Sequence, residues 1–319
     1  MFYSWGRFSY AHRKAIPLVL VGVILVLFFS FGTRLGDRMS QEGWEDPGAA
    51  STSAAQIELE TFGRDNSGDV ILLFEDPDAH AAEATAFLKD LKSQHPEQID
   101  SVTSYFDTRN PNLITRDHST AFAAIGLKGD GEQTLKDFRA IEDSLHASDL
   151  PVQVAGATAV ADALDEGMAQ DISRAEKAAL PLVGLLLLVV FGSVVAAFMP
   201  LVVGGLSILG SLGILSVLAG FLQVNVFAQA VVTLLGLGLA IDYGLFMVSR
   251  FREELDKGRE VKEAVAITTA TAGQTVVFSA AMVAVSLSGL FLFPQAFLKS
   301  VAYGSISAVG LAALLSVMV

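Results

Sequence analysis

Long apolar stretches constrain the fold of this chain more than any other feature, because about 20 apolar residues in a helix are enough to cross a lipid bilayer. Hydrophobic residues make up 52% of its 319 residues and charged residues only 17%, against about 25% charged residues in an ordinary soluble domain. Six stretches reach the spanning length, at 15–34, 178–198, 200–222, 226–249, 272–293 and 300–319. The sequence therefore predicts an α-helical membrane protein with six spans, of which we expect the last to be truncated.

A hydrophilic block, residues 36–177, separates the first two spans and is long enough for a domain with its own core. It holds 28 acidic and 11 basic residues, a net charge of −17, and so accounts for the acidity of a chain whose net charge is −13. Such a surface repels nucleic acid and anionic headgroups, so we expect no nucleic-acid partner. A solvated acidic surface is a sufficient explanation of the charge.

Strand and helix patterns alternate within this block. Capped helical patterns predict helices over 78–96 and 131–148. Runs of β-branched and aromatic residues bounded by Gly and Pro predict strands over 68–77, 99–106, 119–129 and 151–156. The order β-α-β-β-α-β is that of the split βαβ, or ferredoxin-like, α+β unit. A fold of this kind does not by itself assign a function.

Basic residues in the short flanks predict the orientation, because cytoplasmic loops carry an excess of Lys and Arg. The short loops on the opposite side hold only Lys299, near the last span. Eight basic residues fall on one side of the membrane: Arg7, Arg13, Lys14, Arg250, Arg252, Lys257, Arg259 and Lys262. We therefore expect a multi-pass protein of the cell (inner) membrane with a cytoplasmic N-terminus and a periplasmic block.

The first apolar stretch is interpreted as an uncleaved helix, since its core is too long for a signal peptide and no small-x-small cleavage motif follows it. The sequence has no cysteine, so the periplasmic block is held by packing rather than by disulfides. We expect five parts: a cytoplasmic tail with the first span, a periplasmic domain, spans two to four, a cytoplasmic loop with an amphipathic helix, and spans five and six, at 1–35, 36–177, 178–249, 250–271 and 272–319.

Catalytic and cofactor motifs are absent from the sequence. No Gly-Lys dipeptide occurs, so the chain has no Walker A loop. The histidines lie outside the spans and form no close set of metal ligands: His12, His80, His95, His118 and His146. We therefore expect a protein that is not an enzyme, has no metal or organic cofactor, and draws its energy from another source.

One carboxylate lies inside the predicted spans two to six, away from their ends: Asp242, in the stretch "GLGLAIDYGLFMVSRFREEL". A charge at that depth costs at least about 2.5 to 3.5 kcal/mol, and such residues usually take part in ion or proton pathways. The alternative is a protonated or hydrogen-bonded carboxyl that only helps helices to pack. We favour a proton relay, in which the phenol of Tyr243 donates to the carboxylate or passes a proton on.

Helical spacing separates the neighbours of Asp242 into two stripes. Ser279, in the fifth span, lies at a depth from which it could reach the carboxyl group. Gly238 and Phe246 share the stripe of Asp242, and a small-xxx-small ridge that allows close helix contact follows another: Gly236, Ala240 and Gly244.

Several motifs of the chain resemble those of one transporter family. "GLGLAIDYGLFMVSRFREEL" is preceded by "FAQAVVTLL" and followed by "QTVVFSA" and "LFLFPQAFLKS"; the chain opens with "MFYSWGRFSY" and has "FGRD" at 62–65. Together they resemble the mycobacterial membrane protein large (MmpL) branch of the resistance-nodulation-division (RND) transporters, and within it the exporters of trehalose monomycolate. The likeness covers essentially the whole chain.

The resemblance implies a lipid exporter driven by the proton motive force, with a mycolic-acid glycolipid such as trehalose monomycolate as cargo and protons as the coupling ion. It assigns the relay to Asp242 and Tyr243, places Ser279 beside them, and associates Gln41 and Asp65 with the lipid cavity of a periplasmic porter domain. The family has twelve spans and a second Asp-Tyr pair in span ten. We therefore expect this chain to be an N-terminal half whose partner is the C-terminal half.

Two other functions are compatible with the sequence. The chain could also assemble as a homo-oligomer. A SecD/SecF-like accessory subunit of protein export has the same arrangement of one span, one domain and five spans. A non-transporting membrane scaffold or sensor would use Asp242 for packing alone.

Overall fold

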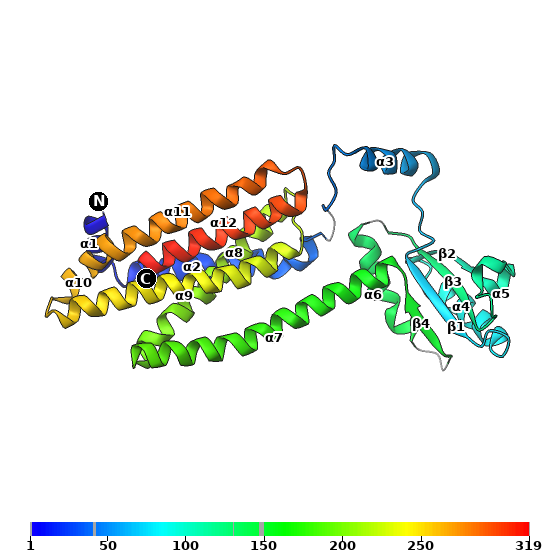
Figure 1. Ribbon diagram of the computed structural model, residues 1–319, viewed down its shortest axis with the longest axis horizontal. Helices are drawn as coiled ribbons and strands as arrows, with labels where there is room; N and C mark the ends of the chain where they lie inside the picture. Colours follow the sequence, from blue (N-terminus) through cyan, green and yellow to red (C-terminus); the bar gives the residue numbers. More distant parts are fainter. Residues whose placement is uncertain (1, 41–42, 130, 147–149, 319) are drawn as a thin grey trace. The chain divides into compact units, whose positions relative to one another are not determined.

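The computed structural model describes residues 2–40, 43–129, 131–146 and 150–318. The chain divides into two compact units, one formed by Ala50–Arg174 and the other by Met1–Ala49 together with Ala175–Val319. The first is an α/β unit and the second a bundle of long helices (Figure 1).

A four-stranded antiparallel sheet, in the order β2-β3-β1-β4, forms the centre of the α/β unit. Its strands and main helices follow one another along the chain as β1 (Val70–Glu75), α4 (Ala81–Gln94), β2 (Ile99–Ser104), β3 (Thr120–Leu127), α6 (Glu132–Leu145) and β4 (Val152–Ala155). The short α5 (Tyr105–Thr108) and η3 (Pro111–Leu113) lie between β2 and β3. Each of the four strands and two helices falls within the range predicted for it.

One face of the sheet carries the core of this unit. Alternate residues of β1 are buried, namely Val70, Leu72 and Phe74, and they cluster with buried residues of both α4 and α6. Large side chains stand opposite small ones across the ladder, since Phe74 pairs with Ala121. This fit lets both helices cover the same face of the sheet.

Five helical segments of the described residues are long and apolar enough to cross a membrane: Ala15–Arg34, Val194–Ala219, Phe227–Asp256, Val261–Leu292 and Ala296–Met318. They comprise α2 (Ala15–Ser30) with η1 (Gly32–Arg34), α8 (Val194–Ala219), α9 (Phe227–Asp256), the run α10 (Val261–Thr268), η4 (Thr269–Gly273), α11 (Gln274–Ser288) and η5 (Gly289–Leu292), and α12 (Ala296–Met318). The chain is therefore a helical membrane protein.

The second predicted span, 178–198, is not confirmed. Its residues are divided between the end of α7 (Ala157–Phe191) and the start of α8, with Gly192 and Ser193 between the two helices. The apolar end of α7 follows the charged Arg174 and Lys177, so it is too short to qualify as a span on its own. It nevertheless packs on the bundle, where Leu187 and Phe191 are buried.

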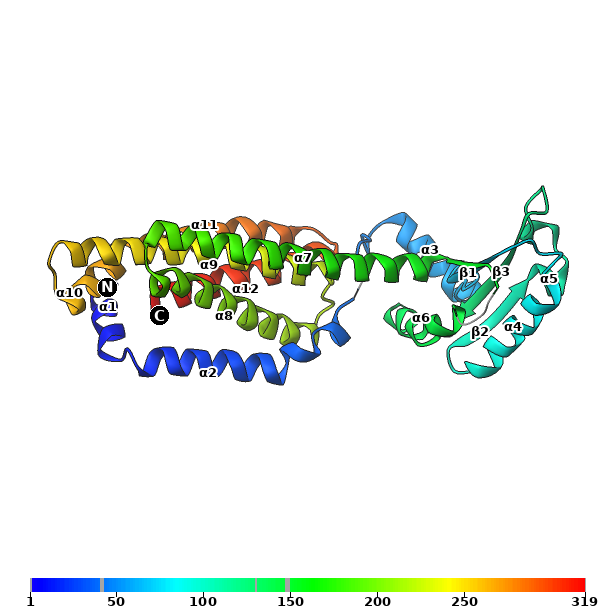
Figure 2. The ribbon, with the colours of Figure 1, turned by 90° about the horizontal axis from the view of Figure 1, so that it is seen from below.

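Helix α9 occupies the middle of the bundle and packs against α8 and α12. Helix α11 contacts α12 (Figure 1). Figure 2 shows α2 at the edge of the bundle, where α8 is the span that it contacts. The sequence patterns did not predict α1 (Phe2–Ala11), the short η2 (Gly36–Arg38) or α3 (Ala50–Phe62), which has no buried residue, and they did not predict the short α5 and η3 between β2 and β3.

The predicted cytoplasmic loop, 250–271, is mostly helical. Helix α9 continues to Asp256, and α10 runs into α11 through a single π-helical turn, η4. Turns of this kind are frequent at functional sites. The N-terminal helix α1 docks on this region at Gly6, where a β-carbon would lie 2.8 Å from the Cα atom of Ala266. Only glycine allows so close an approach.

Candidate functional site

Asp242 and Tyr243 follow each other in the middle of α9 but face different surroundings. Successive residues of a helix point about 100° apart, because one turn takes 3.6 residues. The side chain of Asp242 is exposed on the surface of the helical unit, whereas Tyr243 is buried and only 6% exposed. The structure therefore joins the pair through the backbone, and no hydrogen bond between their side chains is found in the described part of the chain.

The exposed side of Asp242 continues along the helix. Gly238 and Phe246, one turn before and one turn after, are also exposed, and no atom lies within 4 Å of the point where a β-carbon of Gly238 would be. Phe246 is 45% exposed. We call Gly238, Asp242 and Phe246 the open stripe of α9. It offers a carboxylate flanked by a glycine and an aromatic ring.

The predicted ridge of small residues lies on the opposite, buried side of α9. Gly236, Ala240 and Gly244 are all buried. A β-carbon on Gly244 would lie 2.8 Å from the Cβ atom of Pro200 in α8, and one on Gly236 would lie 3.4 Å from the Cβ atom of Ala308 in α12. Small residues on the ridge thus set how closely α9 approaches its neighbours.

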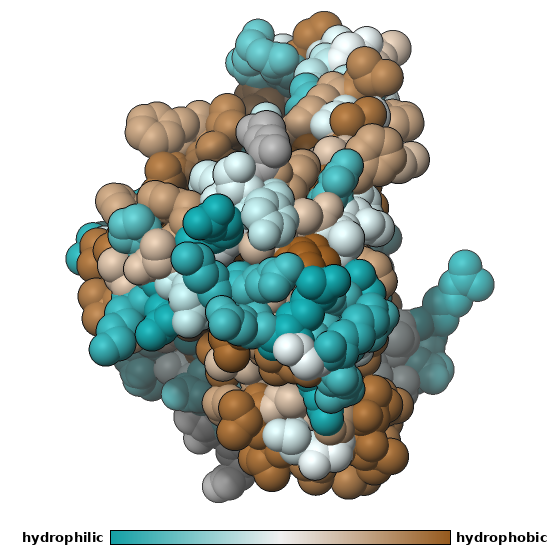
Figure 3. All heavy atoms as spheres, turned by 90° about the vertical axis from the view of Figure 1, so that its left-hand side faces the viewer, coloured by the Kyte–Doolittle hydropathy of each residue, from teal (hydrophilic) through white to brown (hydrophobic). Residues whose placement is uncertain are grey.

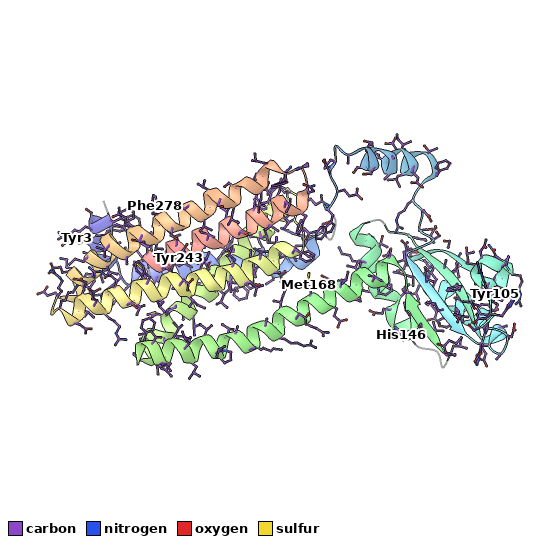
Figure 4. The ribbon with its side chains drawn as sticks, viewed as in Figure 1. Tyr3, Tyr105, His146, Met168, Tyr243 and Phe278 are labelled. Atoms are coloured by element: carbon purple, nitrogen blue, oxygen red, sulfur yellow. The ribbon has the colours of Figure 1, made fainter. Side chains whose placement is uncertain are left out.

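The phenol of Tyr243 lies inside the bundle, on α9 (Figure 4). It belongs to an apolar cluster that includes Val203, Val276 and Val309 from three other helices. Its hydroxyl is buried and has no hydrogen-bond partner among the described residues. A buried hydroxyl without a partner is unfavourable by about 1–3 kcal/mol, so this group is available to a water molecule or to a carboxyl group that changes position.

Ser279 lies on α11 and is half-buried. Among the residues that the structure describes, its hydroxyl has no hydrogen bond to Asp242 or Tyr243. Helix α11 packs mainly on α12 rather than on α9. The support that Ser279 would give the relay therefore stays a prediction.

Two tentative lipid-binding residues were expected in the hydrophilic block. Gln41 lies outside the described residues. Asp65 is exposed, and its Oδ1 accepts hydrogen bonds from the hydroxyl of Ser67 at 2.6 Å and from its N–H group at 3.0 Å. Hydrogen bonds from the Ser67 hydroxyl and N–H group hold the pKa of Asp65 below its ordinary value. The carboxylate thus stabilises its own turn, and its contact with lipid stays a prediction.

The "FGRD" motif also holds a structural ion pair that the sequence did not reveal. Arg64 Nη2 lies 2.6 Å from Oδ1 of the buried Asp69, whose Oδ2 accepts a hydrogen bond from the N–H group of Leu127 at 3.0 Å. The pair fixes the start of β1 to the end of β3. A basic and an acidic residue five positions apart, with a second acidic residue between them, gave no specific signal for this pair in the sequence.

An ionic cluster closes the turn between α9 and α10. Glu254 is only 2% exposed, and its carboxylate lies within 3.0 Å of the side-chain nitrogens of three basic residues, Arg250, Lys257 and Arg259. Hydrogen bonds to Glu253 and Glu254 raise the pKa of Lys257 above its ordinary value. Hydrophilic side chains gather in a band across this end of the bundle, with apolar side chains above and below (Figure 3).

No group of three or more His, Cys, Asp or Glu residues that could hold a metal ion occurs within the described ranges. The site is thus built from one carboxylate, one phenol and the helices that hold them. Such groups can take up and release protons.

Residues 43–319 match the MMPL family over most of the chain. The chain belongs to the MMPL family. This MMPL chain is 42% identical, over its whole length, to the trehalose monomycolate exporter MmpL3 of Mycobacterium tuberculosis, of which it covers 35%. It is 40% identical, again over its whole length, to the MmpL3 exporter of Mycolicibacterium smegmatis, of which it covers 33%. The MMPL chain thus spans about a third of the length of these curated relatives.

A more distant relative is the mycolic acid-containing lipids exporter MmpL11 of Mycolicibacterium smegmatis. It is 39% identical over 51% of this MMPL chain, which covers 17% of that protein. The first two relatives are thus named as exporters of trehalose monomycolate and the third as an exporter of mycolic acid-containing lipids.

Proposed function

We propose that this chain is the N-terminal half of a lipid exporter of the cell membrane that is driven by the proton motive force. Its proposed cargo is a mycolic-acid glycolipid, trehalose monomycolate, and protons are the coupling ion. The proposal rests on membership of the MMPL family and on relatives that carry that substrate in their names. The whole exporter would also require a C-terminal half, since the chain covers only 35% of the M. tuberculosis relative.

The open stripe of α9 is the observation that carries the proposal. Asp242 is a carboxylate in the middle of an apolar helix, exposed on the side of α9 that faces away from the packed core. A second helix that brings its own carboxylate and phenol would complete a relay there. In this arrangement the hydroxyl of Tyr243, which has no partner among the described residues, would accept a proton on its oxygen while it passes its own proton to the next acceptor of the relay.

The α/β unit is proposed to be a periplasmic porter domain of ferredoxin-like fold, within residues 36–177. Its sheet order and the succession of strands and helices support this fold. We also propose that the apolar end of α7 crosses the membrane as the second of six spans. The packing of Leu187 and Phe191 against the bundle supports this role.

Collapse of the proton gradient tests the coupling. Cells that depend on the exporter are treated with a protonophore, and the appearance of labelled trehalose monomycolate outside the membrane is followed. We expect export to stop while ATP is maintained at its normal level by substrate-level phosphorylation. Export that continues under these conditions would exclude protons as the coupling ion.

Cysteine labelling tests the proposed topology, and the absence of cysteine makes single substitutions informative. Two exposed lysines serve as a matched pair, Lys89 in the α/β unit and Lys262 in α10. In intact cells, a membrane-impermeant maleimide is expected to label the Lys89→Cys variant and not the Lys262→Cys variant. The opposite pattern would reverse the orientation, and equal labelling of both after lysis is the control for reactivity.

A further inference from the structure

A cavity of about 610 Å³ lies in the helical unit, at the end where α9 meets α10. Helices α1, α8, α9, α10 and α12 contribute to its wall. Its interior is mostly apolar, with Pro200, Met247 and Val265 among the lining residues. The cavity has no part in the proposed proton relay, since neither Asp242 nor Tyr243 lines it.

Two arginines are the charged residues among those that line the cavity, Arg13 and Arg252. Both are exposed. Arg13 lies over the ring of Tyr10, at 4.6 Å from its centre, and Arg252 donates a hydrogen bond to the carbonyl oxygen of Phe191. Neither forms an ion pair with a carboxylate in the described part of the chain, although Arg250, Lys257 and Arg259 nearby all do. The cavity therefore has a positive charge with which no acidic residue pairs in the part of the chain that the structure describes.

Three hydroxyl groups of the lining also have no hydrogen-bond partner within the described ranges, those of Ser9, Thr268 and Ser316. Their residues are 9%, 3% and 7% exposed, respectively, so water on the surface does not reach them freely. Another hydroxyl of α12, that of Ser307, donates to the carbonyl oxygen four residues earlier, that of Tyr303, at 2.7 Å. The unpartnered groups are therefore free to bond a ligand.

We propose that this cavity binds an anionic phospholipid, with the phosphate group near Arg13 and Arg252 and an acyl chain against the apolar wall. Guanidinium groups bind phosphate well, and basic pockets between membrane helices on the cytoplasmic side suit acidic headgroups. The site goes beyond the proposed export function and does not depend on which lipid is exported. A phospholipid held there would join the N-terminal helix α1 to α9 and α10.

Binding of dioleoyl phosphatidylglycerol to the purified chain, measured by native mass spectrometry and by titration in detergent, tests the site. Phosphatidylcholine with the same chains and inorganic phosphate are the comparison probes. We expect phosphatidylglycerol to bind at least about tenfold more tightly than phosphatidylcholine, because basic residues attract acidic headgroups. Equal binding of the two lipids, or displacement of the lipid by millimolar phosphate, would overturn the proposal.

Substitutions then locate the lipid. The double variant Arg13→Gln/Arg252→Gln is expected to weaken binding at least about tenfold, since each arginine near the headgroup contributes several-fold. The matched control is Arg7→Gln/Lys262→Gln, which removes two exposed basic residues that do not line the cavity, and binding should stay within about twofold of the unchanged chain. Equal loss in the two double variants would overturn the site.

A third variant keeps both arginines and fills the apolar wall. Val265→Phe is expected to abolish lipid binding while the thermal midpoint of the chain is retained, and unchanged binding by a folded Val265→Phe chain would overturn the proposal. A photo-reactive benzoylphenylalanine in place of Met247 identifies what occupies the cavity in the protein that joins this chain to its C-terminal half. An adduct with phospholipid supports the site, and an adduct with a protein segment beyond residue 319 contradicts it.

Discussion

Lipid export is expected to stop when Asp242 is replaced by Asn in the protein that joins this chain to its C-terminal half. Asparagine keeps the shape of the side chain but cannot take up a proton. One charge that moves across the membrane is worth about 2.3 kcal/mol per 100 mV, and only a group that titrates can use that drive. Export by the Asp242→Asn variant is therefore expected to fall to the background of cells without an exporter.

The same change at Asp256 is the matched control. Asp256 lies on the same helix, is exposed, and has no ion pair or hydrogen bond of its side chain in the described residues. Asp256→Asn should export normally, and both variants should reach the membrane in equal amounts. Normal export by Asp242→Asn would remove Asp242 from the mechanism and leave it a role in packing alone.

Coupling further requires that the protonated and charged forms of Asp242 favour different helix arrangements, because a ligand shifts an equilibrium only through its differential affinity. The structure supplies one reason to expect this. Asp242 is on the open stripe of α9 and has no partner among the described residues, whereas Tyr243 lies in the core without one. A rotation of α9 of less than one residue step would change what each of them contacts.

Local patterns were enough to predict the strands and helices of the α/β unit, since alternation and capping residues act within a few positions of the chain. Phe74 and Leu88, for example, are buried where their strand and helix patterns place them. The position of the second span could not be predicted in the same way. Arg174 and Lys177 lie in α7 before its apolar end, and Gly192 and Ser193 interrupt the predicted stretch 178–198, so a second span with those limits is not confirmed.

The candidate site was predictable in its residues and less so in its geometry. The depth of Asp242 in an apolar stretch identified it, and helical spacing separated the open stripe from the ridge. The docking of α1, the π-helical turn at Thr269–Gly273 and the cavity depend on contacts between segments far apart in the chain. No periodicity within a single helix carries that information.

Replacement of glycine by valine at two positions of α9 is expected to separate the ridge from the open stripe. A β-carbon on Gly244 would lie 2.8 Å from Pro200, so Gly244→Val forces α8 and α9 apart. Overpacking of this kind costs roughly 1–3 kcal/mol, and the somewhat better helix propensity of valine than of glycine offsets only a small part of that cost. We expect the purified chain of residues 1–319 to unfold at a clearly lower temperature, as followed by circular dichroism.

Gly238→Val makes the same chemical change on the same helix and serves as its control. No atom lies within 4 Å of a β-carbon at Gly238, so the midpoint of the 319-residue chain should be unchanged. In the protein that joins this chain to its C-terminal half, we expect Gly238→Val to reduce export, because a partner helix against the open stripe would meet the added methyl groups. Export should then fall in Gly238→Val although the isolated half is as stable as before. A Gly238→Val protein that exports normally would show that no helix packs closely on the open stripe, and the relay would have to be completed elsewhere.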